Sequence, residues 1–171
     1  MNKKIIEALN KQINEEMFSA YLYLDMAAYA KYKGFDGFAN WFEIQYKEEL
    51  DHAMGLFHYI LEIDAQVELK SIAKPQIKYD SISQLFSLAL KHEQHITKCI
   101  NDLYHLATIE KDFALQSFLK WYIDEQVEEE ANARTYVDKL KIAGDNGQAL
   151  LMLDNELSQR TYTPLDPMVK Q

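Results

Sequence analysis

Apolar residues recur at steps of three and four along most of this chain, which is the spacing of one face of an α-helix. Few residues interrupt the pattern, because the 171 residues include only five glycines and three prolines. The pattern predicts an all-α protein with four long helices and one short helix. We place these helices at residues 4–33, 36–64, 81–108, 113–143 and 146–158, and we expect the tail after them to be irregular.

Individual residues set the expected ends of these helices. Gly34 and Gly144 follow the first and fourth helices, where glycine is the usual residue just past a C-terminus. Asp36 is a candidate cap for the second helix. Ser81 and Gln84 have the spacing of a capping box, which predicts that the third helix starts there.

The connections between the helices predict their arrangement. The first and second helices are joined by a few residues, as are the third and fourth, so each pair should form an antiparallel hairpin. Residues 65–80 are long enough, at roughly 50 Å when extended, to travel the full length of the second helix. We therefore expect one domain over residues 1–171, a four-helix bundle running up-down-down-up with a long crossover, plus a short fifth helix.

Each of the four expected core-facing stripes carries one glutamate near its middle. These are Glu16, Glu49, Glu93 and Glu129, and the second stripe adds His52 one helical turn after Glu49. A single such glutamate usually lies at the edge of the stripe, with its carboxylate in water. Four at a common depth would instead meet inside one core, since all four stripes face the same axis.

A buried cluster of carboxylates needs a compensating charge. No lysine or arginine occupies any of the four stripes, which argues against a network of buried ion pairs. Unpaired buried carboxylates cost several kcal/mol each or become protonated, and crowding like charges raises that cost. A bound multivalent cation removes the problem, because the carboxylates then act as ligands. The pattern therefore predicts a metal centre.

The donor set narrows the choice of metal. Carboxylate oxygens with one imidazole and no sulfur suit iron or manganese, whereas a structural zinc site would use cysteine and histidine. A zinc-protease motif is excluded, because Glu48 stands where its first histidine would be. Four glutamates and a histidine are more ligands than one open metal ion needs, so we expect two ions bridged by carboxylate.

Charge and cysteine content exclude other functions. The formal net charge of −9 disfavours binding to nucleic acid or to an anionic membrane surface, and the single cysteine excludes an intrachain disulfide. The N-terminus lacks the features of a signal peptide, and no segment has the roughly 20 apolar residues of a membrane span. We therefore expect a cytoplasmic protein with no nucleic-acid or membrane partner.

Four segments of the sequence carry a family resemblance: "NEEMFSAYLYL", "YKEELDHA", "KHEQHIT" and "WYIDEQVEEE". Together they show that the chain resembles the bacterial non-haem ferritins over nearly its whole length. The resemblance implies iron storage, with ferroxidase activity that oxidises Fe2+ to Fe3+ using O2 or peroxide. It also implies a hollow homo-oligomer of twenty-four subunits that encloses a ferric oxide mineral, with the fifth helix near the fourfold axes.

The resemblance also assigns roles to the glutamates of the four stripes. Glu16, Glu49 and His52 resemble the ligands of the first iron, which lies within one subunit. Glu49, Glu93 and Glu129 resemble the ligands of the second iron, so that Glu49 bridges the two ions. Beside them the resemblance places three further residues, a glutamine that contacts bound oxygen or water and two aromatic electron donors: Gln126, Tyr23 and Trp121.

The resemblance further implies a third iron site next to the pair. Its ligands would be Glu48, Glu125 and Glu128, with Glu129 shared. The alternative is that the acidic run in the fourth helix is only a solvated face, and for Glu130 we prefer that interpretation.

Differences from the bacterioferritins argue against a haem group and against a second histidine ligand. Bacterioferritins carry a haem-binding methionine after the bridging glutamate, but here that residue is Leu50, so we expect no haem. They also repeat Glu-x-x-His in the fourth helix, where this chain has Gln126 and Glu129. We expect Cys99 in a packing role, and we attribute Trp41 to subunit contacts. The remaining histidines should have surface or interface roles rather than bind metal: His58, His92, His95 and His105. A di-iron oxygenase and a metal-free bundle stay open as alternatives.

Overall fold

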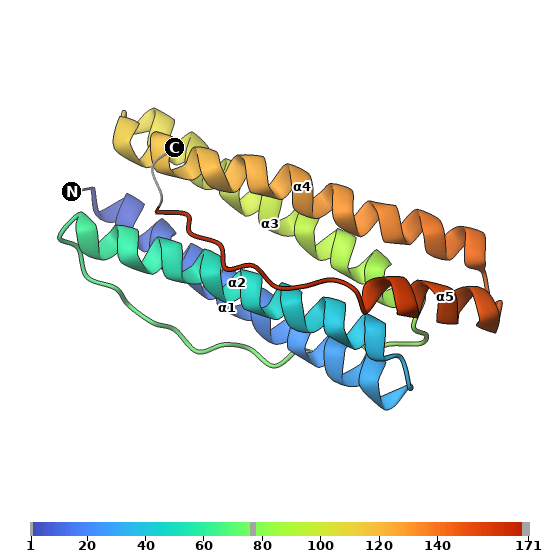
Figure 1. The fold of residues 1–171 in the computed structure, drawn as a ribbon. Helices are drawn as coiled ribbons and strands as arrows, with labels where there is room; N and C mark the ends of the chain where they lie inside the picture. The colour runs from blue at the N-terminus through green and yellow to red at the C-terminus, as the bar shows by residue number, and fades with distance from the viewer. Residues whose placement is uncertain (1, 76–77, 169–171) are drawn as a thin grey trace.

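A computed structural model describes residues 2–75 and 78–168, which fold into a bundle of long helices (Figure 1). The helices are α1 (Lys3–Tyr32), α2 (Asp36–Glu62), α3 (Gln84–Ile109), α4 (Phe113–Ala143) and α5 (Gly147–Leu157). No strand occurs within the described ranges. The all-α class and the fifth helix are confirmed, and most helix ends agree with expectation to within one or two residues.

The long crossover lies against α1 and carries the chain back to the end where α2 began (Figure 1). Near its start, Asn10 on α1 donates to the Gln66 carbonyl at 3.3 Å and accepts from the Glu68 amide at 2.7 Å. Near its end, the Tyr79 hydroxyl donates to Asp25 Oδ2 at 2.6 Å. Helices α2 and α3 therefore run in the same direction, which confirms the up-down-down-up topology.

The start of α2 is capped from a distant part of the chain. Asp36 is its first helical residue and does not cap it, contrary to our prediction. Instead Asp154 of α5 accepts hydrogen bonds from the amides of Gly37 and Phe38 at 2.8 and 3.0 Å. A Cβ on Gly37 would lie 1.6 Å from the Asp154 carbonyl oxygen, so the close approach of α5 depends on glycine at that position. This contact fixes α5 across one end of the bundle.

The start of α3 also differs from the predicted capping box. The helix begins at Gln84, and the Ser81 side chain makes no capping bond there. Gln84 Oε1 instead accepts from the Asp80 amide at 2.8 Å, and Ile82 and Ser83 form the turn that precedes the helix. The glycine ends are as expected, since Gly34 and Gly144 have φ values of 85° and 55°.

The apolar core consists of two clusters, one toward each end of the bundle, with a polar layer between them. Almost all residues of the four predicted stripes are buried. Trp41 also belongs to the core, because it is 4% exposed and its ring lies 4.7 Å from that of Phe86. Its expected role in subunit contacts is therefore wrong. None of the described helices has the length and apolarity needed to cross a lipid bilayer.

The tail after α5 is irregular, as predicted, and runs back along α2 on the side that faces α4 (Figure 1). Arg160 forms an ion pair with Glu48 at 2.6 Å. Further along, Asp51 accepts from the Tyr162 hydroxyl at 2.7 Å and from the Leu165 amide at 2.9 Å. These bonds hold the tail over the middle of the bundle, at the level of the polar layer.

Candidate metal centre

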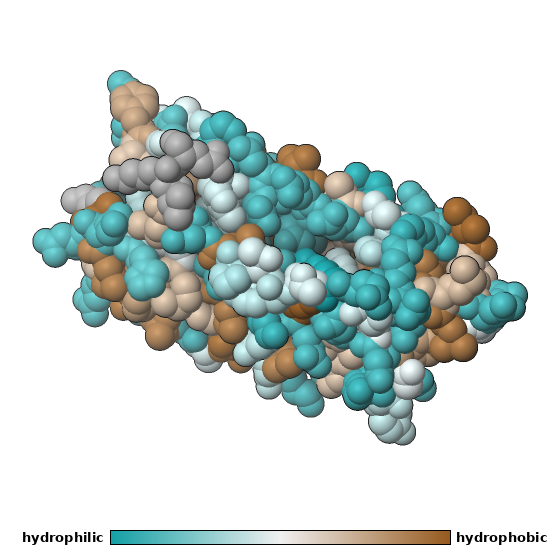
Figure 2. Space-filling model, viewed as in Figure 1, coloured by the Kyte–Doolittle hydropathy of each residue, from teal (hydrophilic) through white to brown (hydrophobic). Residues whose placement is uncertain are grey.

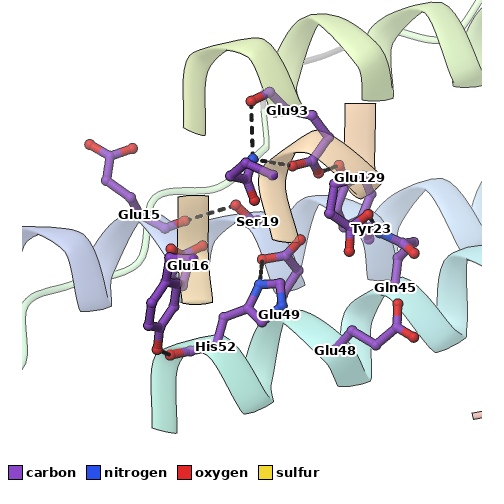
Figure 3. A network of polar contacts seen from close by, with 12 residues as sticks. Glu15, Glu16, Ser19, Tyr23, Gln45, Glu48, Glu49, His52, Glu93 and Glu129 are labelled. Atoms are coloured by element: carbon purple, nitrogen blue, oxygen red, sulfur yellow. Dashed lines mark hydrogen bonds and ion pairs between the residues drawn. The ribbon is translucent and has the colours of Figure 1, made fainter. Parts of the chain in front are cut away.

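The polar layer gathers acidic side chains from four helices in the middle of the bundle (Figure 3). Each is between 1% and 3% exposed, so the layer is closed to bulk water. The sequence-based expectation that these stripes converge is met for the following residues: Glu16 on α1, Glu49 and His52 on α2, Glu93 on α3, and Glu129 on α4.

Three of these side chains bring possible ligand atoms within 4.8 Å of one another: Glu16, Glu49 and His52. The one-turn spacing on α2 places Glu49 Oε2 3.2 Å from His52 Nδ1. Gln12 donates to Glu16 Oε1 at 2.9 Å and so orients that carboxylate. Glu16 Oε2 and His52 Nε2 are buried and have no hydrogen-bond partner among the described residues. Unsatisfied buried acceptors of this kind are what a cation would engage.

Neutral side chains hold the other two carboxylates. The Tyr23 hydroxyl donates to Glu93 Oε1, and Gln126 Nε2 donates to Glu93 Oε2 at 3.1 Å. Gln45 Nε2 donates to Glu129 Oε2 at 2.8 Å. Such supporting hydrogen bonds fix the orientation of potential ligands without neutralising their charge. The sequence placed Gln45 on a core stripe but gave no reason to assign it this role.

A second group of possible ligands joins Glu129 to His52 and Glu125. The resemblance grouped Glu129 instead with Glu49 and Glu93, whose carboxylate is turned toward Tyr23 and Gln126. The structure thus brings together the first predicted set within 4.8 Å, but assembles Glu129 with a different pair. The ring of Trp121 lies 5.5 Å from that of His52, beside this second group.

Burial raises the pKa of all four central glutamates above the ordinary value. For Glu49 burial is the largest cause, followed by the charges of Glu93 and Glu16. For Glu129 burial is followed by the charges of Glu93 and Glu49. No lysine or arginine occurs among the buried polar residues of the described chain. The residues present therefore fit a multivalent cation, which would supply the missing positive charge.

The residues predicted for a third site lie at the edge of the layer. Glu128 is exposed, while Glu125 and Glu48 are partly buried. Arg160 already holds Glu48, although burial outweighs this arginine and still raises the pKa of the carboxyl group. These three glutamates do not form one of the groups of possible ligands within 4.8 Å among the described residues, but the charges of Glu128 and Glu48 add to burial in raising the pKa of Glu125. The guanidinium of Arg160, in the tail, pairs with Glu48, and the resemblance did not indicate this contact.

His92 packs between α1 and α3 within the chain, whereas we expected it at the surface or at an interface. Its Nε2 is 2.7 Å from the Ser19 hydroxyl, and its ring meets the ring of Tyr23 edge-on at 6.0 Å. Burial lowers the pKa of His92 to about 4, so the ring is neutral at physiological pH. The sequence offered no signal for this, because His92 is off the core stripe and next to Glu93.

The fold and this layer together define a carboxylate-lined four-helix bundle of the kind that binds two metal ions between its helices. A ferritin-like domain model matches residues 6–143. The bacterial non-heme ferritin of Staphylococcus aureus strain MRSA252 is 40% identical over 162 residues, which span 95% of this chain and 98% of that protein. The ferritin of Staphylococcus haemolyticus is 39% identical over the same coverage.

Solved structures show the same likeness. An open-pore ferritin from the hyperthermophilic archaeon Archaeoglobus fulgidus has a TM-score of 0.93 and 46% identity, covering 94% of this chain and 99% of that chain. A humanized archaeal ferritin has a TM-score of 0.94 and 47% identity, with 96% and 99% covered. The chain belongs to the ferritin family, which confirms the resemblance, and its function is iron storage.

Proposed function

We propose that the polar layer is a ferroxidase centre and that this chain is an enzyme as well as a storage subunit. Fe2+ is its substrate: one ion binds at Glu16, Glu49 and His52, and a second at Glu49, Glu93 and Glu129. The observation that carries the proposal is the buried, uncompensated charge of these carboxylates, beside unpartnered atoms of Glu16 and His52. Glu49 would bridge the two ions, because it belongs to the ligand group of Glu16 and its carboxyl group also feels the charge of Glu93.

The carboxylates favour oxidation because Fe3+ gains more than Fe2+ from anionic oxygen ligands. Two Fe2+ ions release two electrons. One O2 accepts them with two protons to give hydrogen peroxide, or one peroxide accepts them with two protons to give two waters. Fe3+ then leaves for the mineral. Tyr23, Gln45 and Gln126 hold the ligands in position through the hydrogen bonds described above.

We further propose a shell of twenty-four identical chains, each a single domain, located in the cytoplasm and free of haem. Apolar side chains at and before α5 support an assembly, because Ile142, Leu151 and Met152 are 88%, 61% and 69% exposed in the isolated chain. The contact of Asp154 with α2 holds α5 where it can pack against neighbouring copies. The Archaeoglobus relative is an open-pore ferritin, so an experiment on this shell should also measure whether it is closed.

One observation supports an oxygenase as the alternative. A groove of about 340 Å³ lies between α3 and α4 and is lined in part by Thr97, Val127 and Gln126. It is open to solvent, and the Gln126 amide bonds both Thr97 and Glu93, so this side chain separates the groove from the carboxylates. An organic substrate could reach the centre only if Gln126 moved.

Aerobic loading with Fe2+ distinguishes these functions. We expect each chain to oxidise many more than two iron ions, and the loaded particle to migrate as a large assembly whose iron co-elutes with protein. Oxidised iron is measured by ultraviolet absorption and mass by light scattering after size exclusion. An uptake that stops at two ions per chain, or a monomeric mass, would contradict storage in a shell and favour the oxygenase.

Arg160 is expected to compete with a third ion for Glu48. Arg160→Met keeps an apolar stem against Trp41, over whose ring the guanidinium now lies at 4.7 Å, but removes the charge that pairs with Glu48. We expect the metal-free variant to bind one more Zn2+ per chain than the parent, measured by titration calorimetry. Arg134→Met is the control, because Arg134 pairs with Glu130 on an exposed face. Equal stoichiometry in all three proteins would refute this competition.

A further inference from the structure

Three side chains with different donor atoms meet on the surface between α1 and α3, outside the polar layer. Glu15 comes from α1, and His95 and Cys99 lie one turn apart on α3. His95 Nε2 is 3.1 Å from Glu15 Oε2 and 3.6 Å from Cys99 Sγ, and all three donors lie within 4.8 Å of one another. Carboxylate, imidazole and thiol thus converge on one point.

Two of the three separations between these donors match those around a tetrahedral metal ion, and the third is at most 4.8 Å. Bond lengths of about 2.0–2.1 Å to nitrogen and oxygen and about 2.3 Å to sulfur place neighbouring N and O donors roughly 3.3 Å apart, and N and S donors roughly 3.6 Å apart. A simple ion pair between Glu15 and His95 explains only the first contact. It does not explain why the chain's single cysteine approaches the same nitrogen.

The site is accessible and incompletely enclosed. The side chains of His95 and Glu15 are 52% and 23% exposed, and Cys99 is partly buried. Lys98, the nearest basic residue in sequence, is engaged by Asp102 at 2.6 Å and so is turned to another acid. Three protein ligands leave a coordination position for water, which is the arrangement of an exchangeable ion rather than a structural one.

We propose that Glu15, His95 and Cys99 form a surface site for one borderline divalent ion of the Zn2+, Co2+ or Fe2+ class. A thiolate and a carboxylate neutralise the ion, and the imidazole makes the donor set mixed N, O and S, which favours these ions over Mg2+ or Ca2+. The site lies at the outer end of a row of side chains, in which His92 lies 6.1 Å ring to ring from His95 and bonds Ser19. It goes beyond the ferroxidase centre, with which it shares no residue.

Cobalt binding tests this site without relying on iron chemistry. We expect Co2+ added to the metal-free protein to produce a near-ultraviolet thiolate-to-cobalt charge-transfer band that saturates at one ion per chain. Cys99 is the one cysteine of the chain, so the band reports this site alone even when Co2+ also fills the polar layer. Cys99→Ser should abolish the band. His95→Gln should weaken the affinity of the site for Co2+, measured from the titration of the band, at least tenfold.

His105→Gln is the matched control, because His105 is exposed on the same helix. It should leave both the band and its affinity unchanged. Initial rates of iron oxidation by Cys99→Ser should equal those of the parent, which separates this site from the ferroxidase centre. No charge-transfer band in the parent, or an unchanged affinity for Co2+ in His95→Gln, would overturn the proposal, and neither result would bear on iron storage.

Discussion

Glu49→Gln is expected to stop rapid iron oxidation. Glu49 is 1% exposed, contacts His52 Nδ1 at 3.2 Å and lies in the ligand group with Glu16. A glutamine has the same size but cannot supply an anionic oxygen to two ions at once. The loss should exceed the roughly 10–100-fold that follows removal of a group that only supports a metal ligand. Stopped-flow absorbance after mixing with Fe2+ in air measures it.

The same substitution is expected to stabilise the metal-free protein. Burial and the charges of Glu93 and Glu16 raise the pKa of Glu49 well above its ordinary value, so its ionised form opposes folding at neutral pH. Glutamine removes that ionisation, and the free energy of unfolding should rise by on the order of 1 kcal/mol. Denaturant unfolding in EDTA measures this change.

Glu43→Gln is the matched control, since Glu43 lies on the exposed side of α2. It should change neither the oxidation rate nor the stability beyond a few tenths of a kcal/mol. If Glu49→Gln oxidised iron as fast as the parent, the layer would be a structural polar network and the metal-free bundle would be the better interpretation. A stability gain together with a loss of activity is the result that only a functional cluster explains.

The convergence of the four glutamates could be predicted because a helix repeats its contacts every three to four residues. That local period places Glu93 in the core as reliably as it places Ile96 and Ile100. It also predicted the topology, since hairpin and crossover lengths are local properties. The same reasoning failed for His92 and Trp41, which lie off the central stripes. Each is covered by packing between neighbouring elements, which the period of one helix does not describe.

Contacts between distant parts of the chain explain the remaining differences. Asp154 caps α2 across 117 residues, and Arg160 reaches Glu48 across 112 residues. Nothing in the sequence around Gly37 or Glu48 signals these partners. Both contacts come from α5 and the tail, where the chain turns back along α2 (Figure 1). The contact of Asp154 fixes α5 at one end of the bundle, and the contact of Arg160 changes the edge of the site. The sequence alone was therefore least informative about the predicted third ion site.

The surface of the molecule over α2 and α4 is mostly hydrophilic, with apolar residues scattered singly or in small groups (Figure 2). This face of the chain is therefore polar, as is usual, whereas ionisable carboxyl groups lie at the centre of the core, where stability alone would not favour them. Residues that lower the stability of the folded chain in this way indicate a functional site, provided that a bound ligand restores the lost stability. That relief can be measured directly.

The metal-free protein is expected to lose stability as the pH rises above about 4.5, and a divalent ion should restore it. The pKa values of Glu16, Glu49, Glu93 and Glu129 are raised from 4.5 in the folded state by burial. Above that pH the unfolded chain ionises while the folded chain keeps its protons. Their contribution to stability is therefore complete below pH 4.5 and is lost as the pH passes through the raised folded values.

Thermal unfolding in EDTA from pH 4.5 to pH 8 tests this slope. Zn2+, which binds such ligands without redox chemistry, should raise the unfolding temperature most at the upper end, because there the carboxylates are already available as anions. An excess of about 100 times the dissociation constant stabilises by about 2.7 kcal/mol. A double variant, Glu49→Gln with Glu129→Gln, should flatten the pH profile and remove most of the response to Zn2+. A parent protein that instead gained stability between pH 4.5 and pH 8 in EDTA would show that the four carboxylates are compensated within the fold, and the case for a metal in this layer would fail.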